Sequence, residues 1–143
     1  MLVLDANILI RAVLETRVPM LLRKYAGQAE FFVPDYAFRE ASEHLPVILE
    51  RRTMPIHTAL ETLDSLRKLL QIVELETYAP AEAVARQRLG HRDQDDWPIL
   101  ASALVLGHPI WTEDTDLFGC GVATWTTDRV ELYLSELISN PMP

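Results

Sequence analysis

The sequence has few of the residues that mark secreted, redox-active or nucleotide-binding proteins. Its 143 residues include a single cysteine, Cys120, so no internal disulfide can form, which fits a reducing compartment. Only five glycines are present, and none belong to a phosphate-binding loop, which argues against an ATP- or NAD-dependent enzyme. The apolar N-terminus has no basic region before it, and Asp5 interrupts it at once, unlike an export signal. No apolar run approaches the roughly 18 residues of a membrane span. We therefore expect a soluble cytoplasmic protein.

The net charge is negative, −8 from 21 acidic and 13 basic residues, which at first argues against a nucleic-acid partner. The basic residues are clustered, however, at positions 23–24, 51–52, 67–68 and 86–92. Each cluster alone is more typical of a solvated helix face. Bound divalent ions or a basic partner can also offset the acidic excess locally, so the net charge leaves nucleic-acid binding open.

Short apolar runs alternate with helical patterns along the whole chain, which predicts an α/β domain with a mostly parallel sheet. A chain of 143 residues without repeats or linkers fits one domain, residues 1–143. The first apolar run is continuous rather than alternating, which is typical of a strand covered on both faces. We expect strands at 1–4, 30–34, 71–75, 109–112 and 121–124, helices at 8–14, 19–29, 35–52, 55–70, 80–89, 96–106 and 128–138, and a frayed tail at 140–143. Asp35 is expected to cap its helix, and Pro46 to kink or divide it.

Acidic residues from four separate segments are expected at one edge of this sheet. Asp5 follows the first strand, and Asp114 and Asp116 follow the fourth. Ligands of open α/β sheets bind beyond the carboxyl ends of the strands, where these side chains would lie. Glu40 and Asp96 lie near the starts of their helices and can reach the same edge.

Such a convergence predicts a divalent-cation site. Two carboxylates about 4 Å apart repel by roughly 4 kcal/mol at an effective dielectric near 20, so several together need a cation or protons. Oxygen ligands suit Mg²⁺ or Mn²⁺, which can activate water and stabilise charge on a phosphoryl oxygen. The four histidines are scattered, which argues against zinc. Taken singly, Asp5 or Asp114 is more typical of a helix cap and Glu40 of a surface residue, so the hypothesis depends on their conjunction.

Other aspartate-dependent α/β enzymes fit the sequence less well. A haloacid-dehalogenase phosphatase would need a second aspartate two residues after Asp5, where Asn7 stands, and a lysine near the last acidic motif. A response-regulator receiver likewise needs a lysine after a late strand, and none is present.

Three motifs in order resemble the PIN-domain ribonucleases, and VapC-type toxins in particular. They are Leu2-Val3-Leu4-Asp5-Ala6-Asn7-Ile8-Leu9; Asp96 leading into Ile99-Leu100-Ala101-Ser102-Ala103-Leu104 and Gly107; and Ile110-Trp111-Thr112-Glu113-Asp114-Thr115-Asp116-Leu117-Phe118. The resemblance covers essentially the whole chain. It implies a three-layer α/β/α fold with a mostly parallel central sheet and Mg²⁺- or Mn²⁺-dependent hydrolysis of RNA phosphodiester bonds.

Carried over by position, the resemblance gives the catalytic acids as Asp5, Glu40, Asp96, Asp114 and Asp116. Asp5, Asp96 and Asp114 would hold the metal, and Glu40 or Asp116 would position the attacking water or a second ion. Glu43, one turn from Glu40, is an alternative to it, and Asp93 and Asp95 are alternatives to Asp96. Asn7 and Thr112 stand where polar residues support the metal or its water.

The resemblance also implies partners. Toxins of this kind are commonly homodimers inhibited by a cognate antitoxin, a basic segment of which enters the acidic pocket. An alternative is a non-catalytic PIN-like module whose acidic pocket binds a basic protein or a regulatory RNA. A nuclease acting on DNA flaps fits less well, because the chain has no large helical clamp.

Overall fold

The structure is a computed structural model and describes residues 1–139. The tail expected at residues 140–143 lies outside the described residues. Within residues 1–139, no helix combines the length and the apolar character that crossing a membrane requires.

Five parallel strands form the sheet within residues 1–139, and the strand order reverses beside the first strand. They are β1 (Leu2–Leu4), β2 (Phe31–Pro34), β3 (Leu70–Val73), β4 (Ile110–Trp111) and β5 (Thr124–Trp125), in the order β3-β2-β1-β4-β5. The chain builds outward from β1 through β2 to β3, and then returns to place β4 on the other side of β1. Val3 is in register with Ile110, and Leu4 with Trp111. The reversal of strand order between β1 and β4 is the point at which such sheets bind ligands.

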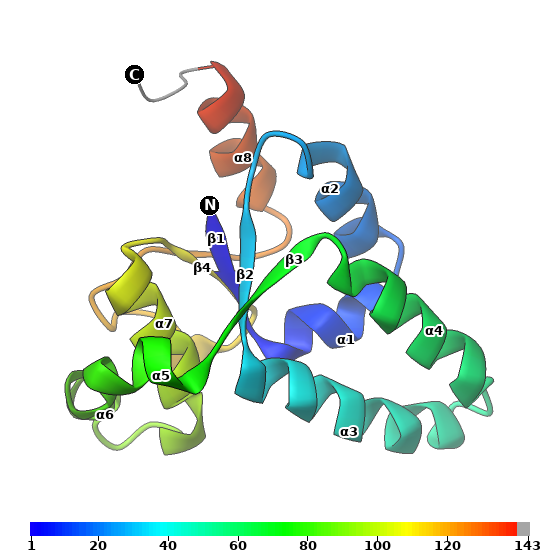
Figure 1. Cartoon of the computed structure of the whole chain (residues 1–143), viewed down its shortest axis with the longest axis horizontal. Helices are drawn as coiled ribbons and strands as arrows, with labels where there is room; N and C mark the ends of the chain where they lie inside the picture. The colour runs from blue at the N-terminus through cyan, green and yellow to red at the C-terminus, as the bar shows by residue number, and fades with distance from the viewer. Residues whose placement is uncertain (140–143) are drawn as a thin grey trace.

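Helices cover both faces of the sheet, which confirms the expected three-layer α/β/α fold (Figure 1). One side carries α1 (Ala6–Leu14), α2 (Arg17–Tyr25), α3 (Asp35–Arg51) and α4 (Ile56–Arg67); the other carries α5 (Leu75–Tyr78), α6 (Glu82–Leu89) and α7 (Trp97–Leu106). The last helix, α8 (Val130–Ser139), is joined to α2 through Glu131, which accepts hydrogen bonds from Lys24 at 2.7 Å and from the Tyr25 hydroxyl at 2.7 Å.

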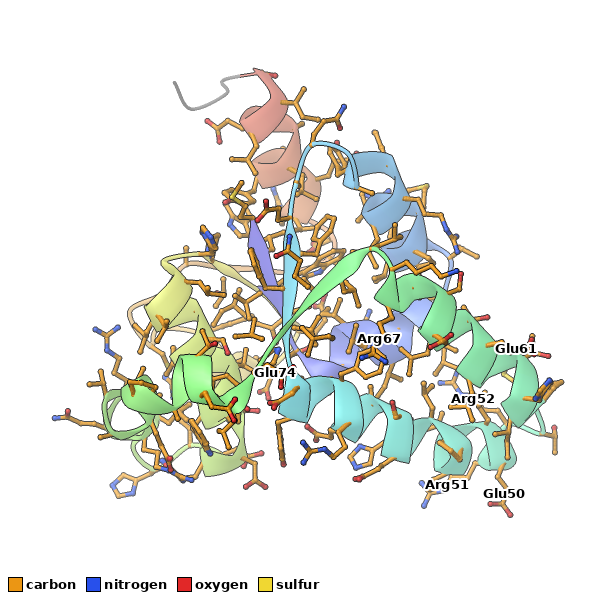
Figure 2. All side chains as sticks on the ribbon, in the orientation of Figure 1. Glu50, Arg51, Arg52, Glu61, Arg67 and Glu74 are labelled. Carbon is orange, nitrogen blue, oxygen red and sulfur yellow. The ribbon has the colours of Figure 1, made fainter. Side chains whose placement is uncertain are left out.

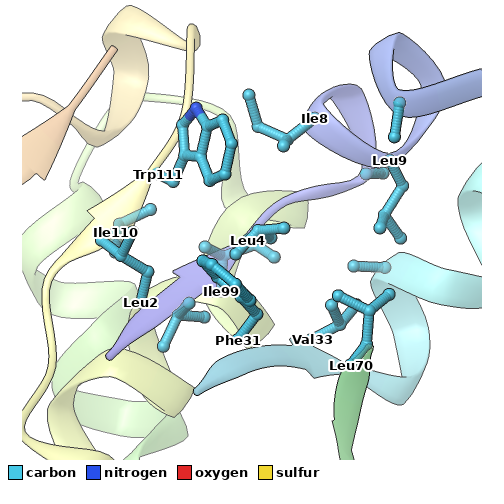
Figure 3. Close-up of a cluster of buried hydrophobic side chains, with 14 of the residues drawn as sticks. Leu2, Leu4, Ile8, Leu9, Phe31, Val33, Leu70, Ile99, Ile110 and Trp111 are labelled. Carbon is cyan, nitrogen blue, oxygen red and sulfur yellow. The ribbon is translucent and has the colours of Figure 1, made fainter. Parts of the chain in front are cut away.

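The core lies around β1, whose three residues are fully buried (Figure 3). Ile8 and Leu9 of α1 pack on one side, and Ile99 of α7 reaches the same cluster. Full burial of one such aliphatic side chain stabilises the fold by about 1.5–3 kcal/mol, so β1 is firmly held. The carboxyl end of β1 is therefore a rigid point on which a site can be built.

Helix α3 continues through Pro46, so the alternative in which Pro46 divides the helix is wrong. Pro46 has no N–H to donate to the carbonyl one turn earlier, which normally destabilises a helix. Leu45 and Leu49 are completely buried on the inner face of α3, and their burial compensates for the missing hydrogen bond.

Two local expectations from the sequence are wrong. Asp35 is the first residue of α3 rather than its cap, and its carboxylate accepts hydrogen bonds from the Leu75 amide at 3.2 Å and the Tyr78 hydroxyl at 2.5 Å. These bonds hold the short helix α5, which has too few residues to show a helical period in the sequence. The strand β5 also begins later than the expected 121–124.

Candidate functional site: an acidic cavity at the strand switch point

Asp5 stands at the carboxyl end of β1 and is only 6% exposed. One carboxylate oxygen accepts the Ile8 amide at 3.0 Å and thereby caps α1, while the other accepts the hydroxyl of Thr112. Burial raises the pKa of Asp5 to about 6, and the nearby charge of Asp114 adds to the rise, while the two hydrogen bonds oppose it. Asp5 is therefore both a helix cap and a buried carboxylate facing the switch point.

Thr112 links the end of β4 to Asp5 and positions the acids that follow it. Its side chain is fully buried, and its hydroxyl oxygen accepts the Asp114 amide at 2.9 Å. Asp114 in turn accepts the Asp116 amide at 2.9 Å through one carboxylate oxygen, which caps a 3₁₀ turn at Thr115–Leu117. A chain of local hydrogen bonds thus fixes the path of the loop after β4.

Asp96 approaches from the other side, at the end of a 3₁₀ turn, Gln94–Asp96, that leads into α7. Asp93 caps that turn by accepting the Asp95 amide at 3.0 Å. Burial raises the pKa of Asp96 well above its ordinary value, and the carboxylates of Asp114, Asp93 and Asp5 raise it further. The Oδ2 atom of Asp96 is buried and has no hydrogen-bond partner among residues 1–139.

Helix α3 contributes Tyr36 and Glu40, which lie one turn apart and face the same space. Burial is the main cause of the raised pKa of Glu40; the charges of Asp93 and Asp95 raise it further, and His44 opposes the rise. Glu43 is exposed and does not line this space. The structure therefore places Glu40, and not Glu43, beside the other acids.

These side chains enclose one cavity of about 130 Å³, which we call the acidic cavity. Its lining is Asp5, Ala6, Asn7, Tyr36, Glu40, Asp93, Asp95, Asp96, Ile99 and Asp114. Four of the five acids predicted from the sequence are thus brought together. The fifth, Asp116, is not part of the lining, but one of its carboxylate oxygens lies within 4.8 Å of oxygens of Asp93 and Asp96.

The residues of the acidic cavity fit a hard divalent cation. Among residues 1–139, Asp93, Asp96 and Asp116 have ligand oxygens within 4.8 Å of one another, while Asp5 and Asp114 line the cavity without belonging to that set. Carboxylates this close repel strongly unless a cation or protons intervene. A buried carboxylate oxygen without a hydrogen-bond donor, as in Asp96, is costly to the fold unless a ligand takes that place. The donors are all oxygens, which favour Mg²⁺ or Mn²⁺ over softer metals.

Two arginines hold the loop that carries Asp116, and sequence reasoning missed this role. Arg92 donates to the backbone oxygens of Asp116, at 3.0 Å, and of Phe118. Arg88 donates to the Cys120 carbonyl at 3.1 Å. In the sequence these residues belong to the basic cluster 86–92, which gives no sign that it contacts a loop about 30 residues away. The glycines of that loop are the feature of the sequence from which a close contact with the loop could have been inferred.

One of those glycines, Gly121, is required by both its backbone and its surroundings. Its φ of +87° favours glycine, and a Cβ atom there would lie 2.5 Å from the Arg88 guanidinium. The close approach of Arg88 to this loop therefore depends on the missing side chain.

The fold and the acidic cavity together define a parallel α/β protein with a pocket suited to divalent cations. The family model of the PIN domain matches residues 3–135, and the chain belongs to this family. Among solved structures, PAE2754 from Pyrobaculum aerophilum is similar, with a TM-score of 0.70, 16% identity, and coverage of 96% of this chain and 89% of that one. FitAB bound to an IR36 DNA fragment is also similar, with a TM-score of 0.63, 20% identity, and coverage of 89% and 95%. No match is found among the curated proteins.

The crowded carboxylates predict that the metal-free protein loses stability as the pH rises. The folded state keeps protons on Asp5 and Asp96 at pH values where the unfolded chain, with carboxyl pKa values of 3.8, has released them. Stability from this source is complete below about pH 4 and falls as the pH passes through about 6, the pKa of Asp5, and on through the higher pKa of Asp96. In chelator, thermal unfolding should therefore occur at a lower temperature at pH 8 than at pH 5.5.

Mg²⁺ at about 100 times its Kd should restore about 2.7 kcal/mol at pH 8. Asp96→Asn should flatten the pH dependence and remove the response to Mg²⁺. Asp64→Asn, an exposed carboxylate on α4, should change neither. An equal pH slope in wild type and Asp96→Asn would contradict the assignment.

Proposed function

We propose that the protein is a Mg²⁺- or Mn²⁺-dependent endoribonuclease that hydrolyses RNA phosphodiester bonds. The observation that carries this proposal is the convergence of Asp5, Glu40, Asp96 and Asp114 on one cavity in which a buried carboxylate oxygen has no partner among residues 1–139. Membership of the PIN family supports nuclease chemistry, because PIN domains are generally nucleases that bind divalent metals. RNA as the substrate is supported by the resemblance of the three motifs to PIN-domain ribonucleases.

Asp5, Asp96 and Asp114 would hold the cation, with Asp93 and Asp116 close enough to support a second ion. Bound there, a divalent cation would supply Lewis-acid chemistry, lowering the pKa of water and offsetting charge on the phosphoryl oxygens. The local hydrogen bonds prepare these carboxylates. Asp114 uses one oxygen to accept the Asp116 amide, which leaves its other oxygen for a ligand.

The remaining polar side chains of the cavity suit the other parts of the reaction. Glu40 is half-buried with a raised pKa, so it is suited to accept the proton of an attacking water. When the acids are ionised, hydrogen-bond donors among the lining side chains come from the Asn7 amide and the Tyr36 hydroxyl. Burial and the surrounding carboxylates raise the pKa of Tyr36, which keeps its hydroxyl protonated. We assign both groups to the non-bridging oxygens of the scissile phosphate.

We further propose that the chain is the toxin of a toxin–antitoxin pair and acts as a cytoplasmic homodimer. The resemblance to VapC-type toxins supports this role, and the net charge of −8 suits a basic antitoxin segment. FitAB, which shares the fold at 20% identity, was solved bound to DNA, and an antitoxin that binds DNA would agree with that arrangement.

The purified protein should cleave labelled single-stranded RNA in Mn²⁺ and lose this activity in chelator. Asp96→Asn should lower the rate on the order of 100-fold or more, because the buried ligand charge is removed. Rates are measured by gel at saturating metal, with circular dichroism to verify folding. An inactive wild type that still binds a basic peptide, with Asp5→Asn weakening that binding, would instead favour the non-catalytic module.

Glu40 and Glu43 provide a matched pair on one helix. Glu40→Gln should lower kcat by about 100-fold or more, since a general base is removed from the cavity. Glu43→Gln should leave kcat nearly unchanged, because that side chain is exposed outside the cavity. Equal effects of the two substitutions would remove Glu40 from the mechanism.

Overexpression in a bacterial host should slow growth, and Asp96→Asn should relieve the effect at equal protein level. Co-expression of a cognate antitoxin should restore growth of the wild-type strain. Growth is followed by optical density, with protein amounts verified by immunoblot. Toxicity that persists unchanged in Asp96→Asn would contradict a toxin acting through this nuclease site.

A further inference from the structure

A second and larger hollow, about 690 Å³, opens directly beside the acidic cavity. It is lined by Asn7, Ile10, Arg11, Leu14, Glu15, Ile48, Arg52, Glu113, Asp114 and Thr115, and we call it the arginine groove. Asn7 and Asp114 line both spaces, so the groove is continuous with the acidic cavity. Whatever occupies the acidic cavity has a path outward between α1, α3 and the loop after β4.

Helical geometry explains how the groove is made. Asn7, Arg11 and Leu14 recur at helical spacing and lie on one face of α1. Ile48 and Arg52 lie one turn apart at the end of α3. The half-buried aliphatic side chains of Ile10, Leu14 and Ile48 line the groove as its apolar floor, together with the two arginines.

The charged side chains of the groove differ in whether another group of the protein already contacts them. Within residues 1–139, no carboxylate lies within 4.0 Å of the Arg52 guanidinium. Arg11 has only an exposed contact with Glu15 at 3.6 Å, which is weak. Glu113 is engaged by the Thr127 amide, which donates to its carboxylate at 2.6 Å. Three carboxylates, Glu15, Glu113 and Asp114, line the same groove. Arg52, which has no ion pair among residues 1–139, is therefore the cation most available to an anion, and Arg11 becomes available when it leaves its weak contact with Glu15.

We propose that the arginine groove binds the sugar–phosphate backbone of single-stranded RNA on one side of the scissile bond, with Arg52 and Arg11 contacting phosphates. This proposal rests on the proposed function and identifies how the substrate is held. Guanidinium groups bind phosphate oxygens in a bidentate manner, and an aliphatic floor accepts riboses and bases without reading sequence. The volume of the groove, about 690 Å³, lies within the range of clefts that take small ligands, which suits a short stretch of one strand.

The overall charge makes such contacts necessary. A chain with a net charge of −8 repels a polyanion at a distance, and a cation in the acidic cavity offsets only the charge around it. Cationic side chains next to that cavity are needed to hold the strand on either side of the cleaved phosphate. Arg52 stands in that position because it lines a groove that shares Asp114 with the acidic cavity.

Arg51 supplies the matched control. It is adjacent in sequence and carries the same charge, but it does not line the groove. In Figure 2 Arg51 projects away below α3, whereas Arg52 lies on the side of α3 toward α4. Both residues are exposed, so neither substitution should disturb folding.

The first test measures cleavage kinetics on RNA of two lengths. Arg52→Ala should raise KM for a ten-nucleotide RNA by about tenfold and leave KM for a dinucleotide unchanged, since the short substrate does not reach the groove. Arg51→Ala should change neither KM. The slope of log binding constant against log salt should fall by about 0.7 in Arg52→Ala, as expected for one lost phosphate contact on a single strand. Arg11→Ala should act in the same direction.

The second test separates the groove from the nuclease. Fluorescence anisotropy of a labelled ten-nucleotide RNA is measured in Mg²⁺ with the Glu40→Gln protein, which keeps the three proposed metal ligands, alone and combined with Arg52→Ala or Arg51→Ala. Weaker binding only with Arg52→Ala supports the groove, even if the wild type proves to cleave nothing. Equal binding of the two double variants, or equal KM of the two single variants in an active enzyme, would overturn the groove while leaving the nuclease proposal intact.

Discussion

The hydrogen bond from the buried Thr112 hydroxyl to the Asp5 carboxylate is the interaction on which the site depends. It joins the ends of β1 and β4, the two strands between which the order of the sheet reverses. Because Thr112 also accepts the Asp114 amide, one side chain sets the positions of two acids from distant segments. The hydroxyl serves as donor on one side and acceptor on the other, which an apolar residue of similar shape, such as valine, would not reproduce.

Gathering several carboxylates around one cavity opposes folding, and the surrounding structure compensates for it. The three residues of β1 are fully buried, and α7 packs its own buried face against the same sheet. Among residues 1–139, Arg92 forms no ion pair with these carboxylates; it donates to backbone oxygens and so fixes the loop that presents Asp116. Within the described part of the chain the acids therefore stay close together without ion pairs to arginine, which leaves their oxygens available to a cation. A salt-bridged cluster would be more stable and unable to bind metal.

The sequence alone was sufficient to predict the fold and most of the residues of the candidate site, and the reasons are physical. A continuous apolar run followed by an acidic residue, as at Asp5, predicts a buried strand that ends in a site residue. This prediction needs only the local sequence. The helical spacing of Tyr36 and Glu40 places both on one face, but only the rotation of α3 against the sheet decides between Glu40 and Glu43. The hydrogen bonds of Asp35 to α5, and of Arg92 to a loop far along the chain, are tertiary contacts that no local period encodes.

The fate of the basic clusters shows why net charge is a poor guide to binding. Lys24 is paired with Glu131, and Arg67 lies over the Phe38 ring with 5.4 Å to its centroid. Arg86 is paired with Glu82 at 2.7 Å. Each of these cations contacts a partner elsewhere, and none of the three lines the acidic cavity. A charged side chain contributes to recognition when it is unpaired and borders the site. The structure identifies such residues one by one, whereas the composition gives only their number. An acidic protein can therefore bind an acidic polymer when its unpaired cations border the site that receives the polymer.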